Sequence, residues 1–177
     1  KNIDYNFCGV MGGPVQSEQG ILGGIYGGKK RNFLKCKKYL NSFCKSVFNF
    51  GDVTKASSAK LLSNFLSLLT TTSVIEFFKS ANKLDVDIKL LCEVAKLGSG
   101  NSGALDRIAG KAIKGNYKGY VFSVDNTYKD LHYINDLVSD LSNANKLIKI
   151  AKSFYSDASK KGYGNYLVSE LIDKDKY

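Results

Sequence analysis

Residues 54–84 read TKASSAKLLSNFLSLLTTTSVIEFFKSANKL, and this stretch decides the fold. Its apolar side chains recur at helical spacing. The series comprises Leu61, Leu62, Phe65, Leu68, Leu69, Thr72, Ile75 and Phe78. The pattern predicts a single helix of roughly 30 residues, well beyond the usual average of about 11–12. Because it is apolar on more than one face, we expect it to run through the centre of a helical domain or an oligomer interface.

Shorter helical segments follow this stretch. Asp87 is expected to cap a helix that ends near Lys96. The glycine- and serine-rich loop after it lacks a preceding strand and a following Gly-Lys-Ser/Thr, so it resembles a phosphate-binding loop only superficially. Further helices are predicted over residues 104–113, 126–141 and 146–160, with a last turn or two over 166–172. Together these segments predict an all-α domain of about five or six helices.

The first fifty residues have a different character. Residues 7–11 form a short apolar run before a turn signal at 12–14, and 20–28 are typical of a glycine-rich strand. A helix over about 30–42 and a strand over 47–50 complete the segment. This β portion is too small to hold a core of its own. The predicted fold class is therefore mainly α, preceded by a small β remnant.

The net charge of +10 comes from 26 basic and 16 acidic residues. Such an excess is compatible with a nucleic-acid partner. The lysines are spread along helical segments, however, which favours a solvated surface. One cluster stands out, and its members are Lys29, Lys30, Arg31, Lys35, Lys37 and Lys38. It lacks the signature of an RNA-recognition motif or a zinc finger, so nucleic-acid binding is kept only as the weakest of three hypotheses.

The four cysteines are Cys8, Cys36, Cys44 and Cys92, and none forms a C-x-x-C pair. With a single histidine, His132, no metal site is expected. Buried free thiols are favoured, which indicates a reducing, cytoplasmic compartment. No apolar stretch free of polar residues reaches the roughly 20 residues of a membrane span, and no signal peptide is apparent, so no membrane partner is expected. A start without Met predicts a fragment of a longer protein.

Several motifs together carry a family resemblance. GGPVQSEQGILGGIYGG, residues 12–28, resembles the segment of β-hydroxyacid dehydrogenases in which a Gly-Gly pair binds substrate before a glycine-rich strand. GDVTKASSAKLLSNF, residues 51–65, is similar to the start of that family's long interdomain helix. Phe122, Lys129-Asp130-Leu131 and GYGNYLVSELI, residues 162–172, resemble its downstream motifs. The likeness covers nearly the whole chain in the right order, and relatives include 3-hydroxyisobutyrate and 6-phosphogluconate dehydrogenases and glyoxylate/succinic semialdehyde reductases.

The resemblance implies a fold like the C-terminal domain of 6-phosphogluconate dehydrogenase. Residues 1–52 would then be the last strands and helix of a truncated Rossmann-type cofactor domain, and 53–177 the substrate-binding and dimerisation domain. It implies NAD or NADP as the cofactor, a small carboxylate as the substrate, and a homodimer or tetramer. No G-x-G-x-x-G motif follows a strand in this chain, so the cofactor is expected to be bound mainly by a domain that the chain lacks.

The resemblance also assigns site residues. Lys60 would be the general acid/base and Asn64 would orient the substrate. Gly12 and Gly13 would bind the carboxylate beside Met11. The remaining assignments are Phe122 over the active site, Lys129 toward the cofactor and Asp130 near the substrate.

The residues support this chemistry without the family. Oxidising a β-hydroxyacid needs a base for the hydroxyl proton, and a lysine with a pKa lowered by burial can take it and return it. Lys60 and Asn64 are four residues apart, so they share one helix face. The backbone N–H groups at Gly12-Gly13 can approach a carboxylate because no Cβ obstructs it. Taken alone, each residue also has an ordinary role on a solvated surface or in the core.

Three departures from the family pattern bear on activity. Met11 stands where the family has a serine that contacts the substrate carboxylate, Ser63 replaces the first residue of an Asn-Asn pair, and Leu167 replaces an acidic residue. Losing the serine hydroxyl removes a hydrogen bond of roughly 1.5–3 kcal/mol. The alternative hypothesis is therefore a non-catalytic helical oligomerisation module that has lost the chemistry.

Overall fold

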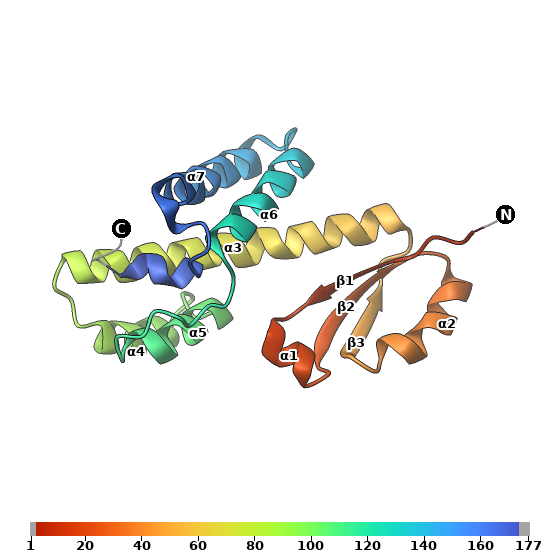
Figure 1. Cartoon of the computed structure of the whole chain (residues 1–177), viewed down its shortest axis with the longest axis horizontal. Helices are drawn as coiled ribbons and strands as arrows, with labels where there is room; N and C mark the ends of the chain where they lie inside the picture. Colours follow the sequence, from red (N-terminus) through yellow and green to blue (C-terminus); the bar gives the residue numbers. More distant parts are fainter. Residues whose placement is uncertain (1–2, 174–177) are drawn as a thin grey trace. The chain divides into compact units, whose positions relative to one another are not determined.

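The computed structural model describes residues 3–173. The chain divides into two compact units, Lys1–Ser63 and Asn64–Tyr177. The long helix α3 (Val53–Lys83) begins in the first unit and ends in the second (Figure 1). The domain boundary at residues 52/53 that the sequence suggested coincides with the start of α3, and it stays a prediction.

The first unit is built on a three-stranded sheet in the order β1-β2-β3. Strand β1 (Phe7–Met11) pairs antiparallel with β2 (Leu22–Gly27), and β2 pairs parallel with β3 (Cys44–Asn49). Helix α2 (Lys30–Leu40) connects β2 to β3, as parallel pairing requires. The buried ring of Tyr26 lies 5.0 Å from that of Phe33 on α2, so α2 packs on the sheet through these aromatic residues.

The segment between β1 and β2 differs from the predicted turn and strand. A short helix, α1 (Pro14–Glu18), follows Gly12-Gly13, because proline at the first helical position favours a helix start. Gly20 adopts φ +66°, and its N–H donates to Ser17 O at 3.1 Å. This turn takes residues 20 and 21 out of the predicted glycine-rich strand, so β2 begins only at Leu22.

Glycine at position 27 lets α3 start directly beside β2. A Cβ at Gly27 would lie 2.5 Å from Ala56 Cβ and 2.7 Å from Asp52 O. Real Cβ atoms do not come so close, so a larger residue would push the first turn of α3 off the strand. This glycine therefore fixes where the residues of the next turns, including Lys60, lie relative to β1 and β2.

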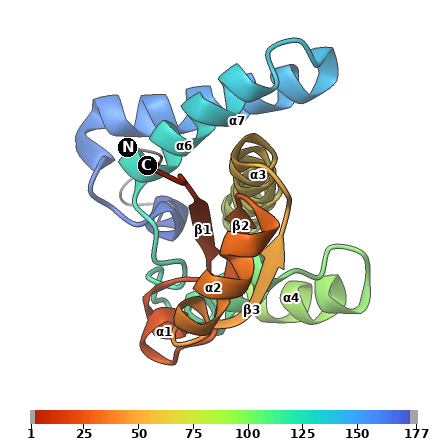
Figure 2. The same ribbon diagram turned by 90° about the vertical axis from the view of Figure 1, so that its right-hand side faces the viewer.

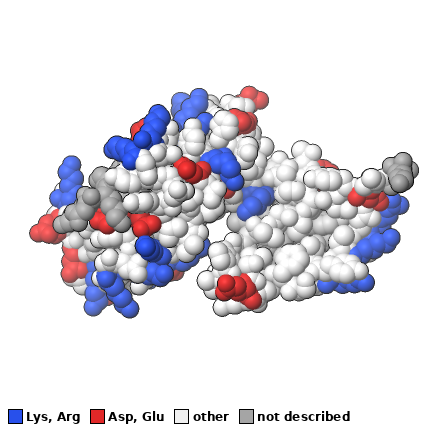
Figure 3. Space-filling model, viewed as in Figure 1, with Lys and Arg blue, Asp and Glu red and all other residues white. Residues whose placement is uncertain are grey.

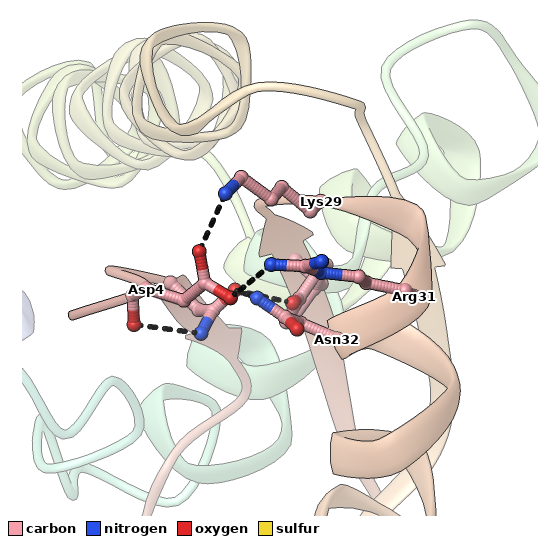
Figure 4. Close-up of polar contacts among 6 residues, drawn as sticks. Asp4, Lys29, Arg31 and Asn32 are labelled. Atoms are coloured by element: carbon pink, nitrogen blue, oxygen red, sulfur yellow. Dashed lines mark hydrogen bonds and ion pairs between the residues drawn. The ribbon is translucent and has the colours of Figure 1, made fainter. Parts of the chain in front are cut away.

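A polar cluster attaches the segment before β1 to the start of α2 (Figure 4). Asp4 accepts from Lys29 Nζ at 2.6 Å and from Arg31 at 2.9 Å, and these cations hold the pKa of its carboxyl well below its usual range. Tyr26 donates its hydroxyl to Asn6 Oδ1 at 2.7 Å, and Asn32 donates to the same oxygen. Two members of the predicted basic cluster are thus paired within the unit.

The second unit is helical. After α3 come α4 (Ile88–Leu97), α5 (Gly103–Ala112), α6 (Val124–Leu137) and α7 (Ser142–Ala158). A π-helical turn, η1 (Ser159–Tyr163), and a 3-10 turn, η2 (Val168–Ile172), close the described chain. Helices α6 and α7 lie side by side as an antiparallel pair (Figure 2). The predicted helices are confirmed, with shifted ends.

The helix ends follow from caps. The Asp87 side chain accepts from Leu90 N, as predicted, and Ser102 caps α5 in the same way. Ser123 accepts from Asn126 N, which starts α6 at Val124, two residues before the predicted start. The predicted helix over 126–141 ends at Leu137, because residues 138–141 turn toward α7.

The core of the second unit includes the centre of α3. Ile75 and Phe78 are fully buried, together with Leu131, Ile134, Ile148 and Tyr155. Thr72 on α3 and the Tyr155 hydroxyl on α7 are 2.9 Å apart, which ties the two helices by a hydrogen bond. Leu62 belongs to the predicted apolar series, but it is 49% exposed. The chain therefore does not bury every apolar residue of α3.

Among the described residues, α3 is the one helix long and apolar enough to cross a membrane by length and composition alone. Only 28% of its most apolar window of 18 residues is buried. No membrane-spanning segment was predicted from the sequence, because polar residues interrupt the apolar run of α3. These residues nevertheless leave its mean hydropathy as high as that of a helix that could cross a membrane. The absence of a membrane partner therefore stays a prediction.

The cysteines correct one expectation. All four are free, but only Cys44 and Cys92 are buried, whereas Cys8 is exposed and Cys36 is half-buried. The prediction of buried thiols is thus wrong for Cys8, whose strand β1 lies at the edge of the sheet. Among residues 3–173, no group of three or more His, Cys, Asp or Glu residues could hold a metal ion.

Candidate active site

Lys60 lies about two turns after the start of α3, half-buried against the sheet of the first unit. Its Nζ donates to Met11 Sδ at 3.1 Å. A Cβ at Gly9 would lie 3.2 Å from Lys60 Cγ, so the glycine leaves room for the lysine stem along β1. Because a thioether is only a weak acceptor, the ammonium has a polarizable but poorly solvating neighbour at the end of β1.

The Met11-Gly12-Gly13 segment turns the chain out of β1 beside this lysine. Gly12 adopts φ +127°, a left-handed conformation that favours glycine. A Cβ there would lie 2.7 Å from Leu22 Cδ2, so the position has neither the backbone freedom nor the space for another residue. The structure thus brings Met11, Gly12 and Lys60 together within the first unit.

One predicted anion contact is already engaged. The backbone N–H of Gly13 donates to Gln16 Oε1 at 2.9 Å, as half of a capping box at the start of α1. Gln16 was not among the predicted site residues. Its signal was available: proline at the first helical position and glutamine at the third typify a helix start whose glutamine reaches back to the cap.

Three predicted residues meet in the second unit. Asn64 Nδ2 on α3 donates to Asp130 Oδ2 on α6 at 3.0 Å, and Lys129 Nζ lies 3.3 Å from Asp130 Oδ1. The Asp130 side chain is only 15% exposed, so these two donors compensate for much of its lost hydration. The carboxylate fixes the plane of the Asn64 amide. Lys129, in contrast, projects a largely exposed ammonium toward solvent.

Lys60 and Asn64 are one turn apart on the same helix. That spacing places their Cβ atoms about 5–6 Å from each other on one face. Their side chains therefore share one face of α3. Lys60 contacts Met11 within the first unit, and Asn64 contacts Asp130 within the second.

Phe122 is half-buried and lies just before α6. Its carbonyl accepts from Val168 N at 2.9 Å, and the neighbouring Ser123 pairs with Leu167. The backbone of Phe122 is thus held by the C-terminal η2 segment. At Leu167, where the family pattern has an acidic residue, the backbone N–H donates to Glu170 Oε2 at 3.0 Å. An acidic group lies at this turn, but it caps η2.

His132 lies on the exposed side of α6. Its Nδ1 is 3.0 Å from Lys152 Nζ on α7, and its Nε2 is 3.9 Å from Asp136 Oδ2. His132 is therefore an exposed residue of the second unit. The basic cluster of α2 is likewise exposed, and Figure 3 shows blue side chains gathered over that helix.

The residues fit a nicotinamide cofactor only in part. Lys129 offers an exposed cation that could contact a phosphate. No G-x-G-x-x-G motif follows a strand in this sequence, so the usual pyrophosphate-binding signature is not present in it.

Comparisons with known proteins identify the family and the fold of the chain. Residues 54–173, more than half of the chain, match the family described as "NAD-binding of NADP-dependent 3-hydroxyisobutyrate dehydrogenase". The structure of 3-hydroxyisobutyrate dehydrogenase from Salmonella typhimurium superposes with a TM-score of 0.84 at 23% identity, covering 96% of this chain and 59% of that one. This likeness confirms the predicted fold class.

Two curated relatives show how much of a protein the chain represents. It is 24% identical to L-threonate dehydrogenase of Haemophilus influenzae, over 92% of this chain and 54% of that protein. It is 23% identical to cytokine-like nuclear factor N-PAC of Anopheles gambiae, over 95% of this chain and 30% of that protein. The chain therefore spans about half or less of the length of these relatives.

Proposed function

Because this chain belongs to the 3-hydroxyisobutyrate dehydrogenase family of NAD(P)-dependent β-hydroxyacid dehydrogenases, we propose that it supplies the proton-transfer group and part of the substrate site of such an enzyme. The observation that carries the proposal is the pair on α3: Lys60 lies one turn before Asn64, and Asn64 is held by Asp130 at 3.0 Å. A lysine on an ordinary solvated surface has no oriented amide one turn away on the same helix.

In the proposed oxidation, neutral Lys60 takes the proton of the substrate's β-hydroxyl. A bound nicotinamide would supply the hydride acceptor for the same carbon. In the reverse direction the Lys60 ammonium returns the proton to the forming alkoxide. Asn64 hydrogen-bonds the reacting oxygen, and Asp130 prevents its amide from rotating away.

The substrate carboxylate is proposed to bind at the Gly12-Gly13 turn. The Gly13 N–H is available only when Gln16 Oε1 leaves it. Since an anion is the stronger acceptor, a carboxylate can displace the neutral amide oxygen. Met11 contributes no hydrogen bond of the kind a hydroxyl would, which favours a substrate with an apolar group beside its carboxylate. Phe122 is proposed to cover the substrate, and Lys129 to contact a cofactor phosphate.

A second copy of the chain is the proposed partner. The most apolar part of α3 is 28% buried, and Leu90, Val94 and Leu97 lie exposed on α4 at helical spacing. So much exposed apolar surface is unusual for a monomer. A lipid bilayer fits less well, since Asn64 and Thr72 within α3 hydrogen-bond to α6 and α7, helices with charged outer faces.

A non-catalytic helical module is the second candidate. It is favoured by Met11 beside Lys60 and by the occupied Gly13 N–H. It predicts that the full-length protein binds no NADPH or NADH in a fluorescence titration.

The experiment that tests the dehydrogenase proposal is a turnover assay. Full-length protein is incubated with NAD+ or NADP+ and with acids that carry a hydroxyl at carbon 3, such as 3-hydroxyisobutyrate and L-threonate, against lactate as the control. We expect growth of NAD(P)H absorbance with at least one 3-hydroxyacid and none with lactate. Cofactor binding without turnover of any substrate in either direction would contradict it.

A further inference from the structure

Met11 is the single methionine of the chain, and it lies against the proposed proton-transfer lysine. Its sulfur accepts from Lys60 Nζ at 3.1 Å at the end of β1. The side chain is half-buried, so small oxidants in solvent can reach the thioether. The methionine therefore places an oxidisable sulfur in hydrogen-bond contact with a titratable amine.

We propose that Met11 is an oxidation site through which hydrogen peroxide controls Lys60, because the sulfoxide oxygen would hold the lysine in its ammonium form. The thioether is a weak acceptor, whereas a sulfoxide oxygen is a strong and polar one. The effect on turnover rests on the proposed function of Lys60. The oxidation and its effect on the titration of Lys60 do not.

The step balances without any further reagent. A lone pair of Met11 Sδ attacks one oxygen of the peroxide, an S–O bond forms and the O–O bond breaks. The second oxygen leaves as hydroxide and takes the proton of the new S–OH group, which yields the sulfoxide and water. Sulfur is oxidised by two electrons and the peroxide is reduced. Methionine sulfoxide is restored by reductases, which makes the change reversible.

The surroundings leave room for the added oxygen. Met11 pairs with Gly23 across the β1–β2 ladder, and even a Cβ at Gly23 would remain 3.6 Å from Met11 Cβ. Gly9, two residues before Met11 on β1, has no side chain on the same face of the strand. The flexible methionine side chain can therefore present a sulfoxide oxygen to Lys60 without displacing a larger neighbour.

Two of the four thiols are poorly placed to react first. Cys44 and Cys92 are buried, and burial raises the pKa of both thiols. A higher pKa leaves less of the reactive thiolate at neutral pH. Thioether oxidation needs no ionisation, so it is unaffected by this shift.

The test measures the two groups separately. The chain is treated with hydrogen peroxide, and Met11 oxidation is followed by mass spectrometry of its tryptic peptide after thiol alkylation. The pKa of Lys60 is then obtained from the pH dependence of its acetylation by acetic anhydride. We expect a rise of about one unit after oxidation, because a charge-assisted hydrogen bond favours the ammonium. The control is Met11→Leu combined with Ile150→Met, in which an exposed sulfur on α7 is oxidised and the titration of Lys60 stays the same.

Two outcomes would overturn the inference: Met11 resisting doses that oxidise position 150 of the control, or Lys60 titrating identically before and after complete Met11 oxidation. Neither depends on turnover. Failure of the dehydrogenase assay with an intact titration shift would count against the proposed function alone.

Discussion

At the scale of single residues, Gly12 combines backbone strain with a lack of space. Replacing it by alanine imposes φ +127° on a side-chain residue and drives its Cβ toward the buried Leu22. We expect Gly12→Ala to lower the free energy of unfolding by about 2–3 kcal/mol, measured by urea denaturation. Gly51→Ala, with φ +87° and open space around it, is the matched control and should lose only about 1 kcal/mol. Equal losses would show that Leu22 does not constrain the turn.

The Asn64–Asp130 hydrogen bond is a second residue-scale feature, and it can be measured as a coupling. Asn64→Leu and Asp130→Ala each leave part of the network without its partner. A double-mutant cycle in the free energy of unfolding should give a coupling of about 1–3 kcal/mol, because the acceptor is a charged, largely buried carboxylate. Additive losses would mean that Asp130 does not position Asn64.

At the scale of elements, helical periodicity predicted α3 to α7 within a few residues, since each buries a distinct apolar series. It missed α1, whose start is fixed by Pro14 and Gln16 rather than by periodicity. Lys60 and Asn64 were predictable as neighbours because they share a helix. The Asn64–Asp130 contact joins residues 66 positions apart, and no local pattern reports such a contact; only the family resemblance placed Asp130 near the substrate.

The packing of α7 on α3 predicts a pH dependence through Tyr155. Burial raises the pKa of its hydroxyl, despite the opposing hydrogen bond with Thr72. The unfolded chain releases this proton above about pH 10, where the folded protein still holds it. The contribution of Tyr155 to the free energy of unfolding is therefore fully present below about pH 10 and is lost as the pH rises further.

Urea denaturation of Tyr155→Phe checks this. Near neutral pH the variant should be less stable by about 1 kcal/mol, through the lost hydrogen bond. Above about pH 10 its deficit should shrink or reverse, since the variant carries no such group. Tyr133→Phe, at an exposed position on α6, is the control. A deficit that is constant over the whole range would contradict the assignment.

At the scale of the whole molecule, the exposed apolar face of α3 predicts self-association. Leu66 on α3 and Ile150 on α7 are both 69% exposed, so they form a matched pair. Sedimentation equilibrium should give twice the chain mass for the wild type and for Ile150→Glu. Leu66→Glu should shift the equilibrium to monomer, because it places a charge in the proposed contact. A wild-type monomer at micromolar concentration, or equal behaviour of both variants, would rule out this interface.

The most direct test of the central claim is the pH dependence of kcat/KM for hydroxyacid oxidation by full-length protein. With wild type and with Lys55→Ala, the rate should rise with pH as the base loses its proton. Lys60→Ala should lower kcat/KM by at least about 100-fold and remove that ionisation. Lys55 is exposed on the first turn of α3 and pairs with Asp52 at 3.7 Å, so its loss controls for charge removal from the same helix. Turnover by Lys60→Ala at the wild-type rate and with the wild-type pH profile would contradict the account.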